Sequence, residues 1–463
     1  MNTILFYLVS FLFIFIPLYP KFPLLNVGGT FVAIRLEDLL IGVTFILWLV
    51  FIFKNKAFKG KFRDNIYKSY LLFFAIGALS LFSAIFLTHT ATASLGLLHF
   101  FRRVEYMLLL SVVATVVNTK KRLITVLVIL FLTLVTVNIY GLGQQFLGWP
   151  VISTTNSEFS KGLILRLTPG ARINSTFAGH YDLAVFLASA LAFLTALFFA
   201  VNKWWKVSIF ITGVISLFAL VLTAARVSFV AAFIGIVFAL IFSKKKKYLL
   251  LVIFLLVLAV IYPSQLRDRF ISTITINLFN LGQRYEGRNL SQQLENKLNI
   301  PTLYYRMASR SANQPTFASA SAGIPVDIAP GEPIDETELA VYRSFKIRFN
   351  IEWPRAINAF LKNPFLGLGY SSLGLATDND FLRSLGEVGL LGTVALFLIL
   401  LAIWKKISRG LKNEDKIVKH FCAGILSMIF VFLVNGTFID VFEASKVALL
   451  FWMMLGLGVA ALR

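Results

Sequence analysis

The sequence has few of the polar residues that a water-soluble protein needs on its surface. Only 14% of its 463 residues are charged, whereas 58% are hydrophobic and the mean hydropathy is +0.80. A water-facing surface cannot be covered with so few polar side chains. The composition therefore excludes a soluble globular protein and predicts an integral membrane protein.

Cysteine and histidine are also scarce. The single cysteine, Cys422, excludes an intrachain disulfide. The four histidines (His89, His99, His180 and His420) are scattered and lack the spacing of a metal site. A phosphate-cradling glycine motif of the P-loop type is missing as well, which leaves ATP-driven transport without support. We therefore expect no metal and no cofactor.

Long apolar runs are abundant. Twelve of them have about the length that crosses a bilayer as a helix, at 3–19, 38–53, 69–87, 104–118, 123–141, 181–201, 207–223, 227–242, 248–262, 386–404, 419–438 and 446–462. They predict an all-α membrane protein with about twelve transmembrane helices. They also divide the chain into a bundle of about nine helices (1–262), a large polar loop (263–385) and a bundle of about three helices (386–463).

The distribution of positive charge predicts the orientation. Six strips that alternate along the chain hold 22 basic and 3 acidic residues, at 54–68, 120–122, 203–206, 244–247, 405–419 and 463. By the positive-inside rule this side faces the cytoplasm, together with both termini, and the large loop is extracytoplasmic. The net charge of +22 is then explained by topology, and nucleic-acid binding is not expected.

The two basic residue types are separated by side. The cytoplasmic strips contain 18 Lys and 4 Arg, whereas the outer loops contain 15 Arg and 5 Lys. Guanidinium binds phosphate or carboxylate in a bidentate fork, whereas Lys is a hydrated point charge. The outer arginines therefore indicate an anionic ligand, or else pairs with the acids of the same loops.

Several arginines are candidates for that ligand. Arg226 lies between two apolar runs with almost no loop around it, where a cation either faces a polar cavity or extends to the lipid headgroups. Arg172 precedes the run at 181–201 and could be an ordinary loop residue. Arg348 and Arg355 share one face of a predicted helix over 338–361.

Three further residues are candidates for proton transfer. Asp378 and Asp380 follow a glycine-containing turn and precede a helix, so they are either helix caps or a general base near the arginines. His180 begins an apolar run and is either a polar helix start or part of the same site.

Three patterns in the chain resemble those of the O-antigen ligase and polymerase superfamily of bacterial membrane glycosyltransferases. They are Arg172-x-x-x-Ser-Thr-Phe-x-x-His180, Leu222-Thr-Ala-Ala-Arg226, and a long block from Arg348 to Gly392 that contains Asn-Pro, Gly-x-Gly, Thr-Asp-Asn-Asp and Gly-Leu-Leu-Gly. The third is the most specific, because the spacing of its four elements is hard to match by chance. The resemblance covers most of the chain in layout and implies a GT-C-like architecture.

The resemblance implies transfer of a glycan from a polyprenyl-diphosphate carrier to an acceptor hydroxyl at the outer face of the bacterial cytoplasmic membrane, without metal or nucleotide. The diphosphate-binding arginines of the family would fall on Arg172 and Arg226, with Arg348 or Arg355 as additions. Asp378, with help from Asp380 or His180, would activate the acceptor, which is a glycan, a lipid or a protein.

One departure from the family bears on the acceptor side. Ligases of the family carry a His-Asn pair where this chain has Asp378 followed by Asn379, so Asp378 replaces the histidine or the acceptor differs. The alternative function is a flippase for lipid-linked glycans. A flippase would show internal repeats and polar residues deep in several helices, and the sequence has neither.

Overall fold

The computed structural model describes residues 1–26, 33–55, 64–152, 164–165, 167, 171–275, 344–374 and 376–462. The fold is helical apart from two small antiparallel sheets. The first pairs β1 (Pro23–Asn26) with β2 (Ala33–Arg35), and the second pairs β3 (Val151–Ile152) with β4 (Ile164–Leu165). The all-α fold that the apolar runs predict is confirmed in this part of the chain.

Each of the twelve predicted apolar runs coincides with a helix. These helices are α1 (Asn2–Leu18), α2 (Leu36–Lys54), α3 (Asn65–Phe82) with the π-helical turn η2 (Ser83–Leu87), α4 (Ala93–Val116), α5 (Lys120–Leu147), α6 (His180–Leu197), α7 (Lys203–Leu222), α8 (Arg226–Phe242), α9 (Leu249–Ile261), α16 (Asp380–Ser408), α17 (Lys416–Asn435) and α18 (Ser445–Ala460). Short 3₁₀ turns, η4 (Lys246–Tyr248) and η6 (Arg409–Lys412), precede α9 and follow α16.

Among the described residues, 7 helices are long and apolar enough to cross a membrane: α2, α3 extended by η2, α5, α6, α7, α16 and α17. Helices α9 and α10 (Gln265–Thr275) together are also long and apolar enough, but they meet at a bend of 93°. If they form one broken span, it is the eighth. Helices α1, α8 and α18 are apolar but shorter. The chain is therefore a multi-pass membrane protein, and the count of twelve spans stays a prediction.

The centre of the bundle is formed by α6, α8, α17 and α18. Helix α6 packs against α8 and α17, and α18 packs against α4. Every residue of α18 is buried. At its crossing with α4, a Cβ on Gly456 would lie 2.7 Å from the carbonyl oxygen of Leu110. Small residues let helix backbones approach this closely in membrane proteins.

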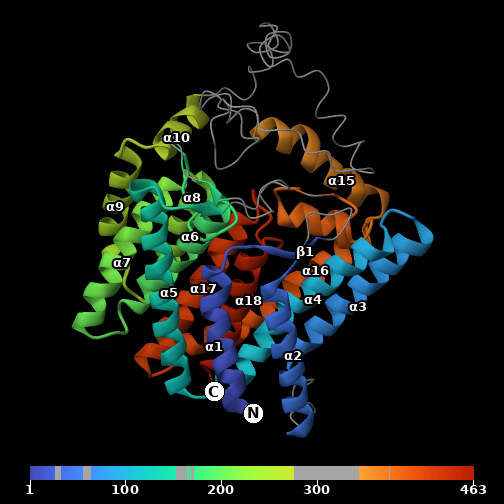
Figure 1. Ribbon diagram of the computed structural model, residues 1–463, viewed down its shortest axis with the longest axis horizontal. Helices are drawn as coiled ribbons and strands as arrows, with labels where there is room; N and C mark the ends of the chain where they lie inside the picture. The colour runs from blue at the N-terminus through green and yellow to red at the C-terminus, as the bar shows by residue number, and fades with distance from the viewer. Residues whose placement is uncertain are drawn as a thin grey trace, which may run out of the picture.

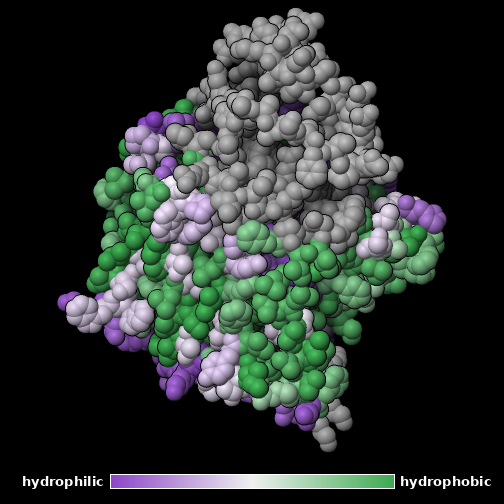
Figure 2. Space-filling view, viewed as in Figure 1, coloured by the Kyte–Doolittle hydropathy of each residue, from purple (hydrophilic) through white to green (hydrophobic). Residues whose placement is uncertain are grey.

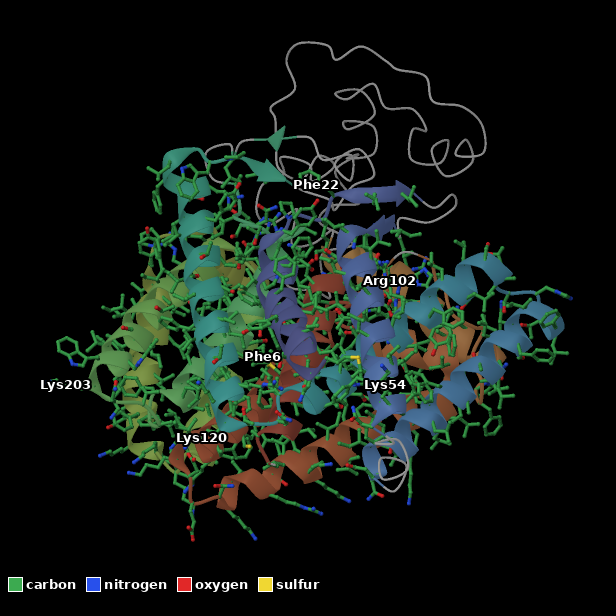
Figure 3. All side chains as sticks on the ribbon, turned by 60° about the horizontal axis from the view of Figure 1, so that its bottom comes forward. Phe6, Phe22, Lys54, Arg102, Lys120 and Lys203 are labelled. Atoms are coloured by element: carbon green, nitrogen blue, oxygen red, sulfur yellow. The ribbon has the colours of Figure 1, made fainter. Side chains whose placement is uncertain are left out.

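The outer helices expose apolar faces instead. In Figure 2 hydrophobic residues cover most of the visible bundle, while hydrophilic residues lie along its lower edge, at its upper left and at its right-hand edge. Both termini lie at that end, and α10 and α15 (Trp353–Lys362) lie at the opposite end (Figure 1). Lys54, Lys120 and Lys203 lie on one side of the bundle and Phe22 on the other (Figure 3). This separation agrees with the predicted sidedness of the lysines, and the cytoplasmic orientation of that side stays a prediction.

Helix α16 begins at Asp380, earlier than the predicted start at 386. The apolar run begins only after two polar turns, and Asn379 caps them by accepting hydrogen bonds from the backbone N–H groups of Phe381 and Leu382. Residues 380–385 therefore belong to α16, although the sequence predicted them to be part of the large loop.

A break inside α16 joins two parts of the long sequence block. Gly389 has φ 66° and ψ −170°, a conformation that only glycine adopts readily. The break frees backbone groups of α16, and the preceding 364–369 segment uses them. Leu368 donates to the carbonyl of Gly386, and Leu390 donates to that of Pro364. The Gly-x-Gly and Gly-Leu-Leu-Gly elements therefore form one structural unit.

The large predicted loop is described only at its two ends. Helix α10 follows α9, and the second end contains the π-helical turn η5 (Arg348–Glu352) and α15, with Pro354 in the first turn of α15. The middle of the predicted loop, residues 276–343, which includes the start of the predicted helix over 338–361, lies outside the described residues.

Candidate active site

The segment before α6 brings Arg172 and His180 together. An Arg172 Nη1 lies 2.6 Å from His180 Nε2. Ser175, at φ 51°, fixes the turn between them, since its backbone N–H donates to Gln144 Oε1 at 2.7 Å and its carbonyl accepts from Gln144 Nε2 at 3.0 Å. Thr176 Oγ1 donates to the carbonyl of Pro17. The first pattern is thus a buried turn that places an arginine beside the start of α6.

Arg226 is the first residue of α8, directly after a tight turn in which Ala224 has φ 52°. Its side chain reaches α10: Nη1 donates to the carbonyl of Arg269 at 3.3 Å and also to Thr273 Oγ1. The guanidinium lies 5.7 Å from the centre of the Phe345 ring. Arg226 therefore connects the bundle to both described ends of the large insert and does not point into lipid.

Arg348 forms an ion pair with Asp378. Its Nη2 lies 2.7 Å from Asp378 Oδ2, and the two side chains are 12% and 32% exposed. Asp378 has φ 49°, a left-handed conformation that Asp tolerates better than most residues. The pair joins η5 to the loop before α16, so it brings together two residues that the sequence separates by thirty positions.

Tyr181 marks the place where these arginines meet. It interacts electrostatically with Arg172, Arg269, Arg348 and Asp378, and Arg226 interacts with Tyr181 in turn. We call Arg172, Arg226, Arg269 and Arg348 the arginine cluster. Four guanidinium groups near one tyrosine form a site of concentrated positive charge, with the Asp378 carboxylate beside it.

Arg269 was not among the predicted site residues. It belongs to α10, where it lies four positions before Thr273, the Arg226 partner. The sequence shows only that Arg269 lies on the polar face of a helix. That pattern is typical of any solvated helix, so only the tertiary fold distinguishes Arg269 from its neighbours.

Arg355 lies at a different place from the cluster. Its Nη2 donates to the carbonyl of Ala376 at 2.6 Å, so it supports the loop that carries Asp378. The π-helical turn η5 lies between Arg348 and Arg355, and the two side chains have different partners.

Asp380 and Asn379 have structural contacts in the same loop. The Asp380 carboxylate accepts hydrogen bonds from the backbone N–H groups of Val441, at 2.8 Å, and Phe442, at 3.2 Å. Asn379 caps α16 and also donates to the carbonyl of Thr437. Of the two predicted acids, Asp378 faces the arginine cluster, whereas Asp380 holds the turn between α17 and α18.

Asp440, in that turn, holds the backbone on both sides of Asp378. Its Oδ2 accepts from the N–H of Thr377 at 2.8 Å, and its Oδ1 accepts from the N–H of Asn379 at 3.2 Å. Arg383 Nε lies 3.6 Å from the same carboxylate and is 2% exposed. Asp440 was not predicted from the sequence, because it lies more than sixty residues from Asp378 and outside the block from Arg348 to Gly392.

Two carboxyl groups in the site have raised pKa values. Burial raises the pKa of Asp378, although the neighbouring Arg348 lowers it. Burial, and then the charge of Asp378, raise the pKa of Glu352 to about 7. Glu352 closes the η5 turn that begins at Arg348. The site therefore contains two carboxyl groups whose protonation changes closer to neutral pH than that of a free side chain.

Within the described ranges, no group of three or more His, Cys, Asp or Glu side chains has the arrangement of a metal site. The positive charge at the site comes from arginine. Fixed cations beside a carboxylate suit a reaction in which a phosphate-linked group leaves and a proton is taken up.

Comparison with known proteins agrees with the pattern in the long block. No protein of curated function matches the chain. Residues 211–397 match the family model described as O-antigen ligase. The match extends from α7 into α16, so it contains Arg226, Arg348 and Asp378, while Arg172 and Asp440 lie outside it. Over these residues the match supports the resemblance to the O-antigen ligase/polymerase superfamily.

Proposed function

We propose that the protein transfers a glycan from a polyprenyl-diphosphate carrier to an acceptor hydroxyl at the outer face of the bacterial cytoplasmic membrane. The observation that carries the proposal is the Arg348–Asp378 pair, at 2.7 Å, next to three further arginines around Tyr181. The family match supports a lipid-linked glycan as the substrate and gives no support to a flippase.

In the proposed reaction the arginine cluster binds the diphosphate. The bond between the anomeric carbon and the diphosphate oxygen breaks, and the leaving diphosphate gains negative charge. Fixed guanidinium groups stabilise that charge without having to reorganise, and such stabilisation is usually the largest single contribution to catalysis. Bidentate guanidinium–phosphate geometry also orients the donor.

Asp378 is the proposed base. The acceptor oxygen attacks the anomeric carbon from the side opposite the diphosphate, which inverts the configuration, and its proton passes to the Asp378 carboxylate. A base acts on a hydroxyl within hydrogen-bond reach. Arg348, paired with Asp378, adjoins both the donor phosphates and the base. His180, which contacts Arg172, is proposed to orient that arginine.

The test is transfer by the purified protein in proteoliposomes that contain a polyprenyl-diphosphate oligosaccharide, with the products separated by size. A ladder of repeats identifies a polymerase, and one shifted acceptor identifies a ligase. Arg226→Ala and Asp378→Ala should abolish transfer. Arg267→Ala should not, because Arg267 on α10 pairs with Asp268. Full activity of the two cluster variants, with normal membrane insertion, would refute the assignment.

A further inference from the structure

A large apolar cavity lies in the bundle, away from the arginine cluster. Its volume is about 350 Å³, within the usual size of ligand sites (about 300–1,000 Å³). It is lined by α5, α6, α7, α17 and α18. Helix α5 packs mainly against α1 and α7, so the cavity occupies the space between α5 and the central helices.

The cavity extends along most of α6. Its lining on that helix runs from Phe186 to Leu197, a rise of roughly 16 Å, and continues to Val201 in the following turn. One leaflet of the hydrocarbon core is about 15 Å deep. The cavity is therefore long enough for a single hydrocarbon chain that enters from one leaflet.

The end of the cavity near the arginine cluster is closed by aromatic packing. Phe186 lines the cavity and contacts Phe177, with ring centres 5.0 Å apart, and Phe177 is fully buried. The opposite end reaches Asn202, Trp205 and Ile417, which lie at the starts of α7 and α17. A ligand chain therefore enters from the end of the bundle where the lysines gather.

Lysines surround this entrance. Lys203 and Lys206 flank the lining residues of α7, and Lys416 precedes Ile417. An adjoining groove is lined by Lys120 and Lys121 and shares Ile124 and Val128 with the cavity. Lys120 pairs with Asp415. In the described residues, the other four form no ion pair.

Helix ends strengthen this positive field. Helices α5, α7 and α17 all begin at the entrance, and helix N-termini carry partial positive charge that favours anions. Trp204, beside the entrance, is 84% exposed, as is typical of aromatic residues at the headgroup level. The entrance is thus suited to an anionic headgroup and the interior to its hydrocarbon chain.

One polar group inside the cavity has no partner. Ser189 lines the wall and is 8% exposed, and its hydroxyl forms no hydrogen bond. It lies thirteen residues from Asn202 at the entrance, so it would face the hydrocarbon chain of a bound lipid and not the headgroup.

We propose that this cavity binds one acyl chain of an anionic phospholipid from the leaflet at the lysine-rich end, with the headgroup held by Lys203, Lys206 and Lys416. The inference does not depend on glycan transfer. The bound chain fills the space between α5 and α6 and so stabilises the helix whose other end carries His180.

Native mass spectrometry of the detergent-purified full chain tests the proposal, with phosphatidylglycerol or phosphatidylcholine added at equal concentration. We expect one phosphatidylglycerol per chain and weaker retention of phosphatidylcholine. A basic residue near a lipid surface contributes enough that Lys203→Gln with Lys206→Gln should weaken retention about 30-fold. The matched control is Lys246→Gln with Lys247→Gln in the η4 turn.

A cavity-filling variant separates the chain site from the charge site. Ala190→Phe should abolish retention, whereas Val214→Phe, at an exposed position of α7, should leave it unchanged. Equal retention of the two phospholipids, unaltered retention in both the Ala190 and the lysine variants, or displacement of phosphatidylglycerol by a polyprenyl phosphate would each overturn the proposal. Because no glycan donor is present, the outcome is separate from that of the transfer assay.

Discussion

Asp440 allows a direct test of how the catalytic loop is held. The change to Asn keeps the shape of the side chain but leaves one oxygen where the carboxylate has two. That carboxylate accepts from the backbone on both sides of Asp378, at 2.8 and 3.2 Å, and faces buried Arg383 at 3.6 Å. Asp440→Asn therefore removes one backbone contact and the negative charge.

The size of the effect follows from these contacts. A hydrogen bond to a charged group contributes about 1.5–3 kcal/mol. Removing one partner of a buried pair costs about 3–5 kcal/mol, but Arg383 also interacts with Glu387 and Glu443, so this part falls below that range. We expect a loss of about 2–4 kcal/mol, concentrated in the loop. A displacement of about 1 Å at a reacting group costs roughly 100-fold in rate.

The assay is steady-state transfer in proteoliposomes, with kcat and KM measured separately. Asp440→Asn should lower kcat about 100-fold with little change in KM for the donor, because the arginine cluster stays in place. Asp64→Asn is the control for stability alone: Asp64 caps α3 and pairs with Lys406 at the far end of the bundle. Wild-type kcat in Asp440→Asn would show that Asp440 does not position Asp378.

Three further predictions follow from the site and the helix break. Arg269→Ala should weaken donor binding about 10–100-fold, as expected for a lost charged hydrogen bond, and titration with labelled donor measures this. Arg348→Gln removes the charge that lowers the pKa of Asp378; because the base acts deprotonated, the acid limb of the pH–rate profile should move to higher pH by about 1–3 units, whereas Arg348→Lys should keep it. Gly389→Ala would bring a Cβ within 2.3 Å of the Phe365 carbonyl oxygen and should lower the melting temperature, unlike Gly42→Ala, where the added Cβ meets nothing within 4 Å.

The helices were predictable because hydrophobic length alone marks them. Every predicted apolar run coincides with a helix, and the error at 380–386 arose where α16 starts with polar turns. Which helices cross the bilayer is harder to predict. Helix α4 carries Arg102, Arg103 and Glu105 near its middle, and such charges are tolerated only because partners elsewhere in the fold neutralise them. Arg103, for example, pairs with Glu443.

The candidate site was partly predictable, because residue type indicated an anionic ligand and the spacing of the long block indicated a family. The sequence could not distinguish Asp378 from Asp380, since both precede the same helix. Only the contacts separate them: one carboxylate pairs with Arg348, and the other accepts backbone hydrogen bonds from the turn after α17. Asp440 could not be predicted for a related reason, because the contacts by which it holds the loop are hydrogen bonds from backbone groups, which leave no trace in residue type.

The central claim is that the arginine cluster binds the donor and Asp378 accepts the proton. The most direct measurement compares donor binding with single-turnover transfer in Asp378→Asn and Arg226→Gln. We predict that Asp378→Asn binds a polyprenyl-diphosphate glycan with near wild-type affinity but does not transfer it, whereas Arg226→Gln loses affinity. Wild-type transfer by Asp378→Asn, or unchanged donor affinity in Arg226→Gln, would contradict the account.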